Sequence, residues 1–161
     1  VGKRRAFPCQ STTHFLYAEE NENGSNEIHA LPLDGSEEIP YWFKGGEFVD
    51  CAYSPDGEKI AFSVVFRGWY SSTIHEYRQY TLDINTGYFR LLTDKFGWAT
   101  RPSWSPDESL LLFTGTEQLD DGYRLLMRYL DRNEITMIFL DDLLPAKSPE
   151  FLTINRVFWL P

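Results

Sequence analysis

The sequence predicts an all-β protein assembled from repeated antiparallel units. The strongest observation is a direct repeat, because residues 48–63 and 100–114 share one pattern at an offset of 51 residues without a gap. A second observation is that each copy contains short apolar runs bounded by turn residues, which is typical of buried strands. Aromatic residues make up 16% of the 161 residues, and their rings can fill the space between stacked sheets. A period of this size indicates one supersecondary unit per copy, stacked on its neighbours.

Each copy begins with an aromatic residue that leads into a tight turn. In the first full copy Pro55 presets φ, Asp56 can bond its own backbone, and Gly57 permits a positive φ. The repeat motif consists of Tyr53, Ser54, Pro55, Asp56 and Gly57 in this copy and of Trp104, Ser105, Pro106 and Asp107 in the next. In both copies the turn feeds an apolar run.

The remaining strands of each copy follow in order. An apolar strand comes directly after the turn, at 59–64 and at 109–114. A hairpin comes next, predicted at 77–83 and 88–93 in one copy and at 123–131 and 134–140 in the other. With the strand that enters the turn, this makes four strands per repeat, which is the anatomy of a propeller blade.

The two ends of the chain carry weaker copies of the same pattern. Residues 15–18, 27–33 and 38–41 read as the strands of an earlier, degraded copy, with 9–12 in place of the Ser-Pro-Asp-Gly turn. Residues 155–161 align with 100–106, so Trp159 and Pro161 stand where the later full copy has Trp104 and Pro106.

On the residues Ala52-Tyr53-Ser54-Pro55-Asp56-Gly57-Glu58-Lys59-Ile60-Ala61-Phe62 and Pro102-Ser103-Trp104-Ser105-Pro106-Asp107, the chain resembles the β-propeller repeat of the TolB type. The resemblance covers nearly the whole chain and implies a partial β-propeller of about three four-stranded antiparallel blades. It implies a single domain over 1–161, with blades at roughly 6–43, 47–94 and 98–141 and a linker and terminal strand at 142–161. It also implies a periplasmic or extracellular location. Proteins with this repeat include interaction proteins of the periplasm, surface proteins and the propeller domains of prolyl oligopeptidase-like enzymes.

The number of blades raises the question of how the propeller is completed. TolB-like propellers usually close with six blades, and an open one would expose sheet faces and strand edges. Two copies could pair into one ring, another subunit could cover the open face, or the chain could be the ordered part of a longer one. The terminal strand could instead complete the first blade, whose innermost strand is poorly marked at 3–8.

Charge and hydropathy exclude two classes of partner. The formal net charge is −9, with 24 acidic and 15 basic residues, whereas nucleic-acid binding needs concentrated Lys and Arg. The basic cluster at 3–5 is short and lies beside a terminus. No stretch approaches the ~20 apolar residues that span a bilayer, so we expect no membrane span, although a membrane-associated complex fits the resemblance.

Catalytic and metal-binding motifs are not found, so we expect no enzymatic activity and no cofactor. His14, His29 and His75 are scattered over different predicted strands or loops. The loop 19–24 carries oxygen ligands at alternating positions and is weakly similar to a calcium-binding loop, but it is better explained as a polar hairpin loop. Two cysteines, Cys9 and Cys51, fall on the inner strands of adjacent blades, where a disulfide is conceivable and two buried free thiols are favoured.

Aromatic residues divide into predicted core and predicted binding residues. Trp42, Trp98, Trp104 and Trp159 are expected in the core or between blades. The aromatic-rich insertion 66–75 and the tail 140–152 are candidate contact segments, since Arg, Trp and Tyr anchor protein interfaces. The candidate partner-binding residues are Arg67, Trp69, Tyr70, Leu143, Leu144 and Phe151.

The predicted function is a non-catalytic protein–protein interaction subunit or scaffold of an extracytoplasmic multi-subunit assembly, either free of the membrane or associated with it. The partner would be another protein, or a second copy that closes the propeller. One alternative is a module that gates or supports a prolyl oligopeptidase-like hydrolase. Another is a propeller that binds a small ligand or sugar at its channel, with Asp50, Arg101 and Arg156 as the nearest polar groups.

Overall fold

The computed structural model describes residues 3–10, 13–20, 26–43, 46–67, 75–96, 98–116, 124–132 and 134–138. Within these ranges the chain forms twelve strands and no helix. The strands make three antiparallel sheets of four, and each strand pairs only with its neighbours in the sequence. The predicted fold class, a partial β-propeller of three four-stranded blades, is therefore confirmed.

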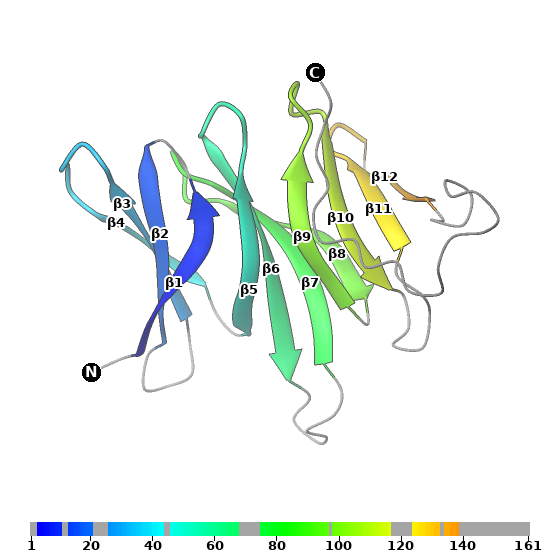
Figure 1. The fold of residues 1–161 in the computed structure, drawn as a ribbon, viewed down its shortest axis with the longest axis horizontal. Helices are drawn as coiled ribbons and strands as arrows, with labels where there is room; N and C mark the ends of the chain where they lie inside the picture. Colours follow the sequence, from blue (N-terminus) through cyan, green and yellow to red (C-terminus); the bar gives the residue numbers. More distant parts are fainter. Residues whose placement is uncertain are drawn as a thin grey trace, which may run out of the picture.

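The three sheets stand side by side in chain order (Figure 1). Blade 1 contains β1 (Lys3–Gln10), β2 (His14–Glu20), β3 (Asn26–Pro32) and β4 (Ile39–Phe43). Blade 2 contains β5 (Glu47–Tyr53), β6 (Lys59–Arg67), β7 (His75–Asp83) and β8 (Phe89–Phe96). Blade 3 contains β9 (Trp98–Trp104), β10 (Leu110–Thr116), β11 (Arg124–Tyr129) and β12 (Glu134–Ile138). Because β1 supplies the fourth strand of blade 1, that blade is complete without the terminal segment.

The turn between β5 and β6 is fixed by the side chains of the repeat motif. The Ser54 hydroxyl donates to Asp56 Oδ1 at 2.6 Å and accepts from the backbone N–H of Lys59 at 2.9 Å. Gly57 has a φ of +77°, a conformation that glycine adopts without steric cost. The turn between β9 and β10 repeats the two serine hydrogen bonds around Ser105.

Two apolar clusters hold the blades together. The cluster between blades 1 and 2 is rich in aromatic rings, whose centroids are 5.0–6.0 Å apart. These rings belong to Phe43, Phe48, Phe62, Tyr80 and Phe89. The cluster between blades 2 and 3 contains Ala61, Leu92, Ala99, Trp104, Leu111, Phe113 and Leu126. Aromatic residues thus fill the space between sheets, as the composition indicates.

The tryptophans do not all follow the prediction. Trp104 is buried between blades 2 and 3, as expected. Trp42 is 68% exposed, so the prediction that it lies in the core is wrong. Its neighbours Tyr41 and Phe43 face blade 2, and side chains alternate across a strand, so Trp42 points the other way. The side chain of Trp98 and the whole of Trp159 lie outside the described residues.

The innermost strands of the three blades share an irregularity. The pairing register shifts between Ala6 and Gln10 in β1, between Phe48 and Asp50 in β5, and opposite Phe113 in β9. β-Bulges of this kind bend a strand and redirect its side chains. The strand β5 contacts both β1 and β9, so the three irregular strands lie next to one another.

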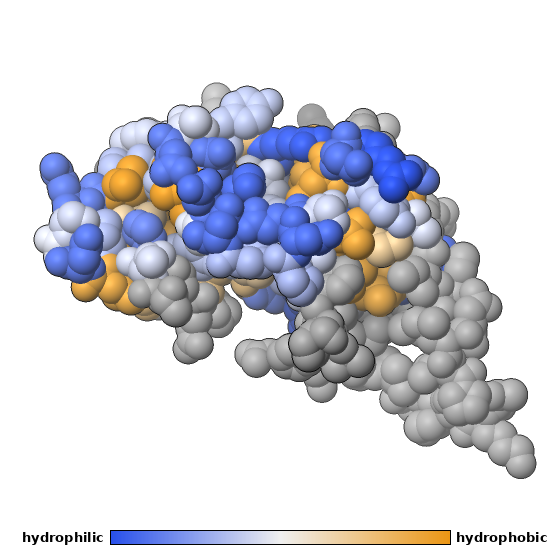
Figure 2. Space-filling model, turned by 90° about the horizontal axis from the view of Figure 1, so that it is seen from above, coloured by the Kyte–Doolittle hydropathy of each residue, from blue (hydrophilic) through white to orange (hydrophobic). Residues whose placement is uncertain are grey.

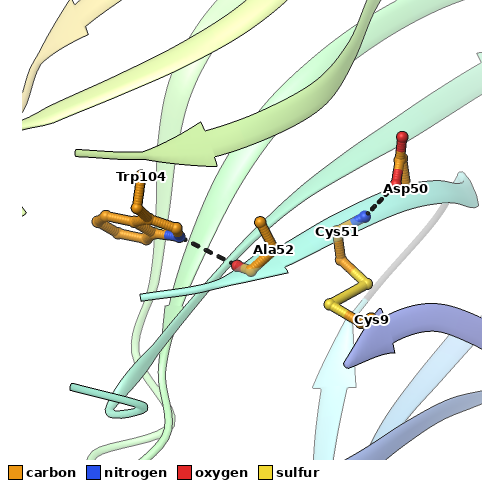
Figure 3. Close-up of a disulfide and its surroundings, with 5 residues drawn as sticks. All are labelled: Cys9, Asp50, Cys51, Ala52 and Trp104. Carbon is orange, nitrogen blue, oxygen red and sulfur yellow. Dashed lines mark hydrogen bonds between the residues drawn. A yellow bond between two sulfur atoms is a disulfide. The ribbon is translucent and has the colours of Figure 1, made fainter. Parts of the chain in front are cut away.

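Cys9 and Cys51 form a disulfide between β1 and β5, with 5.4 Å between their Cα atoms (Figure 3). The prediction of two free thiols is therefore wrong. In the repeat alignment the two cysteines are three positions apart, which favoured two separate thiols. The register shift of β1 lies around Cys9 and changes the level at which its side chain leaves the strand. At the next junction, Trp104 Nε1 donates to the backbone carbonyl of Ala52 at 3.0 Å.

Candidate protein-binding site

One face of blade 1 carries exposed apolar side chains. The face directed at blade 2 includes Leu16, Ile28 and Tyr41. The opposite face is defined by the alternating residues, and we call it the open face: Phe15, Tyr17, His29, Leu31, Pro40 and Trp42. Phe15 is 41%, Leu31 39% and Trp42 68% exposed. Exposed apolar side chains gathered on one face, with polar residues among them, are typical of binding sites in soluble proteins.

The strand register arranges the open face in rows. Phe15 lies opposite Leu31, so two apolar side chains form a row near one end of the sheet. Trp42 lies opposite Glu27 at the other end. Cross-strand neighbours on one face interact directly, so the apolar groups occur at both ends of the face with a polar row between them.

The polar row is held by a network of side chains. The rings of Tyr17 and His29 stack with centroids 4.6 Å apart and an interplanar angle of 2°. Glu38, from the turn before β4, accepts a hydrogen bond from the Tyr17 hydroxyl and pairs with His29 Nδ1. Glu27 Oε2 lies 3.7 Å from His29 Nε2. These contacts join the four side chains into one polar group at the centre of the face.

The repeat shows what the open face corresponds to in the other blades. The same side of blade 2 packs on blade 1 through Phe62 and Tyr80. The same side of blade 3 packs on blade 2 through Leu111 and Phe113. The open face is therefore the blade 1 counterpart of two faces that are each covered by a preceding blade.

The far side of blade 3 differs from the open face. Along β10, Leu111 and Phe113 face blade 2, so the alternating Leu112, Thr114 and Thr116 face away from it. These three residues are only 6%, 1% and 5% exposed, respectively. In the part of the chain that the structure describes, all eight exposed large apolar residues belong to blades 1 and 2, five of them to blade 1 and its turn: Phe15, Leu31, Leu33, Ile39 and Trp42.

The tight turns form a second, polar surface at one end of the blades. Figure 2 looks onto this end and shows hydrophilic residues gathered across it. Hydrogen bonds from the Ser36 side chain and backbone lower the pKa of Asp34, and the Ser105 hydroxyl, with donors from Ser109, lowers that of Asp107. Each carboxylate accepts hydrogen bonds from groups of its own turn, so its role is to stabilise that turn.

The two equivalent turns of blades 2 and 3 are also joined to each other. Glu108 Oε1 accepts from the backbone N–H of Asp56 at 2.8 Å, and Glu108 Oε2 lies 3.1 Å from Lys59 Nζ. Glu108 occupies the place of Gly57 in the repeat and has a positive φ of 59°.

Two of the three polar groups predicted for a channel site lie within the described residues. Asp50 and Arg101 lie on β5 and β9, which are neighbouring inner strands, and both are half-buried. Arg101 has a φ of +59°, an uncommon conformation for a residue other than glycine. Arg156 lies outside the described residues. Among the described residues no group of three His, Cys, Asp or Glu side chains could hold a metal ion.

Most of the predicted partner-binding residues lie outside the part of the chain that the structure describes. Arg67 ends β6, and its side chain is outside the described part. Trp69, Tyr70, Leu143, Leu144, Phe151 and Pro161 lie outside the described residues, as does the loop 21–25 between β2 and β3. Their roles remain predictions. The open face was not identified from the sequence, because the alternation of Tyr41, Trp42 and Phe43 separates the two faces of β4 without showing which of them meets a neighbour.

No helix in the described part of the chain is long and apolar enough to cross a membrane.

The fold is similar to that of several solved structures. No family model matches the sequence, and no curated protein matches it. The structure of putative TolB from Agrobacterium tumefaciens aligns with a TM-score of 0.61 and 18% identity, over 85% of this chain and 49% of that one. TolB from Acinetobacter baumannii aligns with a TM-score of 0.57 and 19% identity, over 83% and 32%. The propeller domain of the Trilobed protease from Pyrococcus furiosus aligns with a TM-score of 0.59 and 16% identity, over 84% and 41%. These values support a TolB-like propeller fold, and the chain spans half or less of each structure.

The comparisons overturn the prediction that the protein is not an enzyme. A variant of the apocarotenoid oxygenase of Synechocystis also shares the fold, with a TM-score of 0.52 and 11% identity over 81% of this chain and 37% of that one. The Trilobed protease domain is a second case in which this fold belongs to an enzyme. One fold supports many functions, and side chains from separate strands can form an active site without a linear motif. The lack of such motifs therefore does not exclude catalysis.

Proposed function

We propose that this protein is a propeller-type subunit that binds another protein through the open face of blade 1. The observation that carries the proposal is the position of Phe15, Leu31 and Trp42 on a face whose counterparts in blades 2 and 3 are covered. Exposed aromatic groups are typical anchors of protein interfaces.

The partner is expected to pack on the face of blade 1 rather than add a strand to its edge. Blade 1 already has four strands, and its outer strand β4 contains Pro40. Proline cannot donate to a strand ladder, so it discourages the addition of another strand at an edge. A sheet with an apolar face, such as another propeller blade, matches the counterpart contacts within this chain.

A different protein is favoured as the partner over a second copy of this chain paired head to tail. That pairing would bring the open face of one copy against the far side of blade 3 in the other. Leu112, Thr114 and Thr116 on that side are buried, so it offers little free surface at β10.

An extracytoplasmic location is part of the proposal. The disulfide between Cys9 and Cys51 supports it, because disulfides persist in oxidising compartments such as the periplasm and the cell exterior. The likeness to the TolB structures is consistent with it.

Site-directed photo-crosslinking in the cells that make the protein tests the proposal. A photoreactive amino acid would replace Trp42 on the open face and, as a matched control, Tyr88, which is 67% exposed on blade 2. We expect a discrete protein adduct from position 42, lost when Phe15→Ser is added, and none from position 88. No adduct at position 42, or the same adducts at both positions, would contradict the proposal.

Light scattering of the purified chain identifies the partner class. A species near 18.8 kDa is expected, because the partner is a different segment. A species of twice that mass, reduced to the monomer by Trp42→Ser, would show that a second copy covers the open face.

A further inference from the structure

The junction between blades 1 and 2 is the one, among the described residues, that contains a covalent bond. The disulfide joins Cys9 in β1 to Cys51 in β5, the innermost strands of the two blades (Figure 3). The following residue of β5, Ala52, accepts the hydrogen bond from Trp104 of blade 3. Neighbouring residues of β5 therefore make one bond to each adjacent blade, a disulfide to blade 1 and a hydrogen bond to blade 3. Of the two, only the disulfide to blade 1 can be broken by a reductant.

Blade 1 is also attached to blade 2 through its outer strand. Phe43 of β4 contacts the rings of Phe62, Tyr80 and Phe89. The Tyr41 hydroxyl donates to the backbone carbonyl of Ile84 at 2.7 Å. These contacts lie three strands away from β1. The blade is thus held covalently at its inner edge and by aromatic packing at its outer edge, with Leu16, Ile28 and Ala30 of the same apolar cluster between the two.

The two cysteines differ in residue exposure. Cys9 is 3% exposed, whereas Cys51 is partly exposed. Thiol–disulfide exchange requires that a thiolate reach one of the two sulfur atoms. Attack at Cys51 is therefore favoured over attack at Cys9.

We propose that the Cys9–Cys51 disulfide is a redox-controlled lock that fixes the inner edge of blade 1 to blade 2. A dithiol reductant attacks Cys51 Sγ through one thiolate, the bond between the two cysteine sulfurs breaks, and Cys9 leaves as a thiolate that takes a proton. The second thiol of the reductant then releases Cys51 as a thiol. The cysteine pair gains two electrons and two protons, and the reductant becomes a disulfide.

Reduction leaves the outer aromatic contacts in place, so blade 1 loosens at β1 while it stays attached at β4. The open face belongs to the loosened blade. The lock itself does not depend on whether that face binds a partner, because it is a property of the isolated chain.

Hydrogen exchange measured by mass spectrometry tests the lock on the full chain, with and without dithiothreitol. We expect peptides from 3–20 to exchange about tenfold faster or more after reduction, since loss of a local constraint lowers the free energy of local opening. Peptides from 98–116 should keep their rates. The variant Cys9→Ser/Cys51→Ser should exchange like the reduced protein and not respond to dithiothreitol.

Three results would overturn the proposal. The untreated protein could show two alkylatable thiols, reduction could leave exchange in 3–20 unchanged, or reduction could speed exchange equally throughout the chain. The variant Trp104→Phe serves as a matched control, because it removes the hydrogen bond at the other junction and should leave the response to dithiothreitol intact. Trapping with glutathione should label Cys51, and a label on Cys9 instead would refute the direction of attack.

Discussion

Two tyrosines at the junction of blades 1 and 2 differ in how their hydroxyl groups are satisfied. Tyr41 donates to the carbonyl of Ile84. The hydroxyl of Tyr53 is buried and has no hydrogen-bond partner within the described structure. Burial raises the pKa of both groups, in Tyr53 with a contribution from Tyr41. Both therefore stay neutral at physiological pH, and only Tyr41 recovers the cost of removing its hydroxyl from water.

Removing each hydroxyl should consequently have different effects. We expect Tyr41→Phe to lower the free energy of unfolding by about 1 kcal/mol, because a buried hydrogen bond is lost. Tyr53→Phe should leave it unchanged or raise it by up to about 1 kcal/mol, because an unsatisfied polar atom is removed. Urea denaturation of the two variants measures this. Equal losses in both variants would refute the assignment.

Glu108 combines a backbone cost with side-chain contacts. Its positive φ of 59° is unfavourable for a residue with a Cβ atom, and its carboxylate joins Asp56 and Lys59 of the neighbouring turn. We expect Glu108→Ala to destabilise by about 1 kcal/mol, since the contacts are lost and the backbone cost stays. Glu108→Gly should destabilise less, because it also removes the backbone cost. Thermal denaturation compares them, and a larger loss in the glycine variant would be inconsistent with this account.

At the scale of elements, the turns of the repeat motif respond to pH. The Ser54 hydroxyl is the main cause that lowers the pKa of Asp56, and the Ser105 hydroxyl that of Asp107, both below the ordinary value of 3.8. Since the folded pKa values are lowered, the contribution of these groups is fully present above pH 3.8 and is lost as the pH falls through the lower folded values. The turns are thus acid-sensitive elements.

Acid titration of thermal stability checks this sign. We expect these groups to have little effect on the melting temperature near neutral pH. The melting temperature should decrease as the pH drops below about 4. The variant Asp56→Asn/Asp107→Asn should start from a lower stability and show a shallower decline. An unchanged slope in the variant would show that other groups cause the acid effect.

The link between blades 1 and 2 depends on the backbone at Gly46. Its φ is +74°, and an added Cβ would lie 2.2 Å from Val64 Cγ1. We expect Gly46→Ala to destabilise by about 3 kcal/mol or more, from steric overlap together with backbone strain. Gly35→Ala is a matched control, because its φ is +83° with nothing within 4 Å, and it should cost about 1 kcal/mol. Similar losses in both, measured by denaturation, would argue against a clash at Gly46.

The elements themselves could be predicted because their determinants are local. Each turn and hairpin is specified by residues a few positions apart, such as Ser54 and Asp56. The exposure of Trp42 and the pairing of Cys9 with Cys51 could not be derived in this way. They depend on which face of blade 1 meets a neighbour and on a register shift in β1, and these are properties of the packed sheets. The open face was missed for the same reason.

At the scale of the whole molecule, the disulfide constrains the unfolded chain as well as the folded one. It closes a loop of 42 residues, which corresponds to about 4 kcal/mol of stabilisation in the chain-entropy model. We expect Cys9→Ser/Cys51→Ser to lower the free energy of unfolding by an amount of this order, as measured by denaturation without reductant. A loss below about 1 kcal/mol would mean that strain or residual structure offsets the entropic gain.

The strictly consecutive pairing of the strands bears on how the chain reaches this structure. Contacts within each sheet form between segments that are neighbours in sequence, so no sheet needs a strand from a later part of the chain. Each sheet can therefore assemble while the rest of the polypeptide is still being synthesised. The crosslinked loop is complete once β5 has emerged, so oxidation can secure the first two sheets before β9 exists. The three sheets can thus form in the order of the chain, with each finished sheet serving as the surface on which the next one packs.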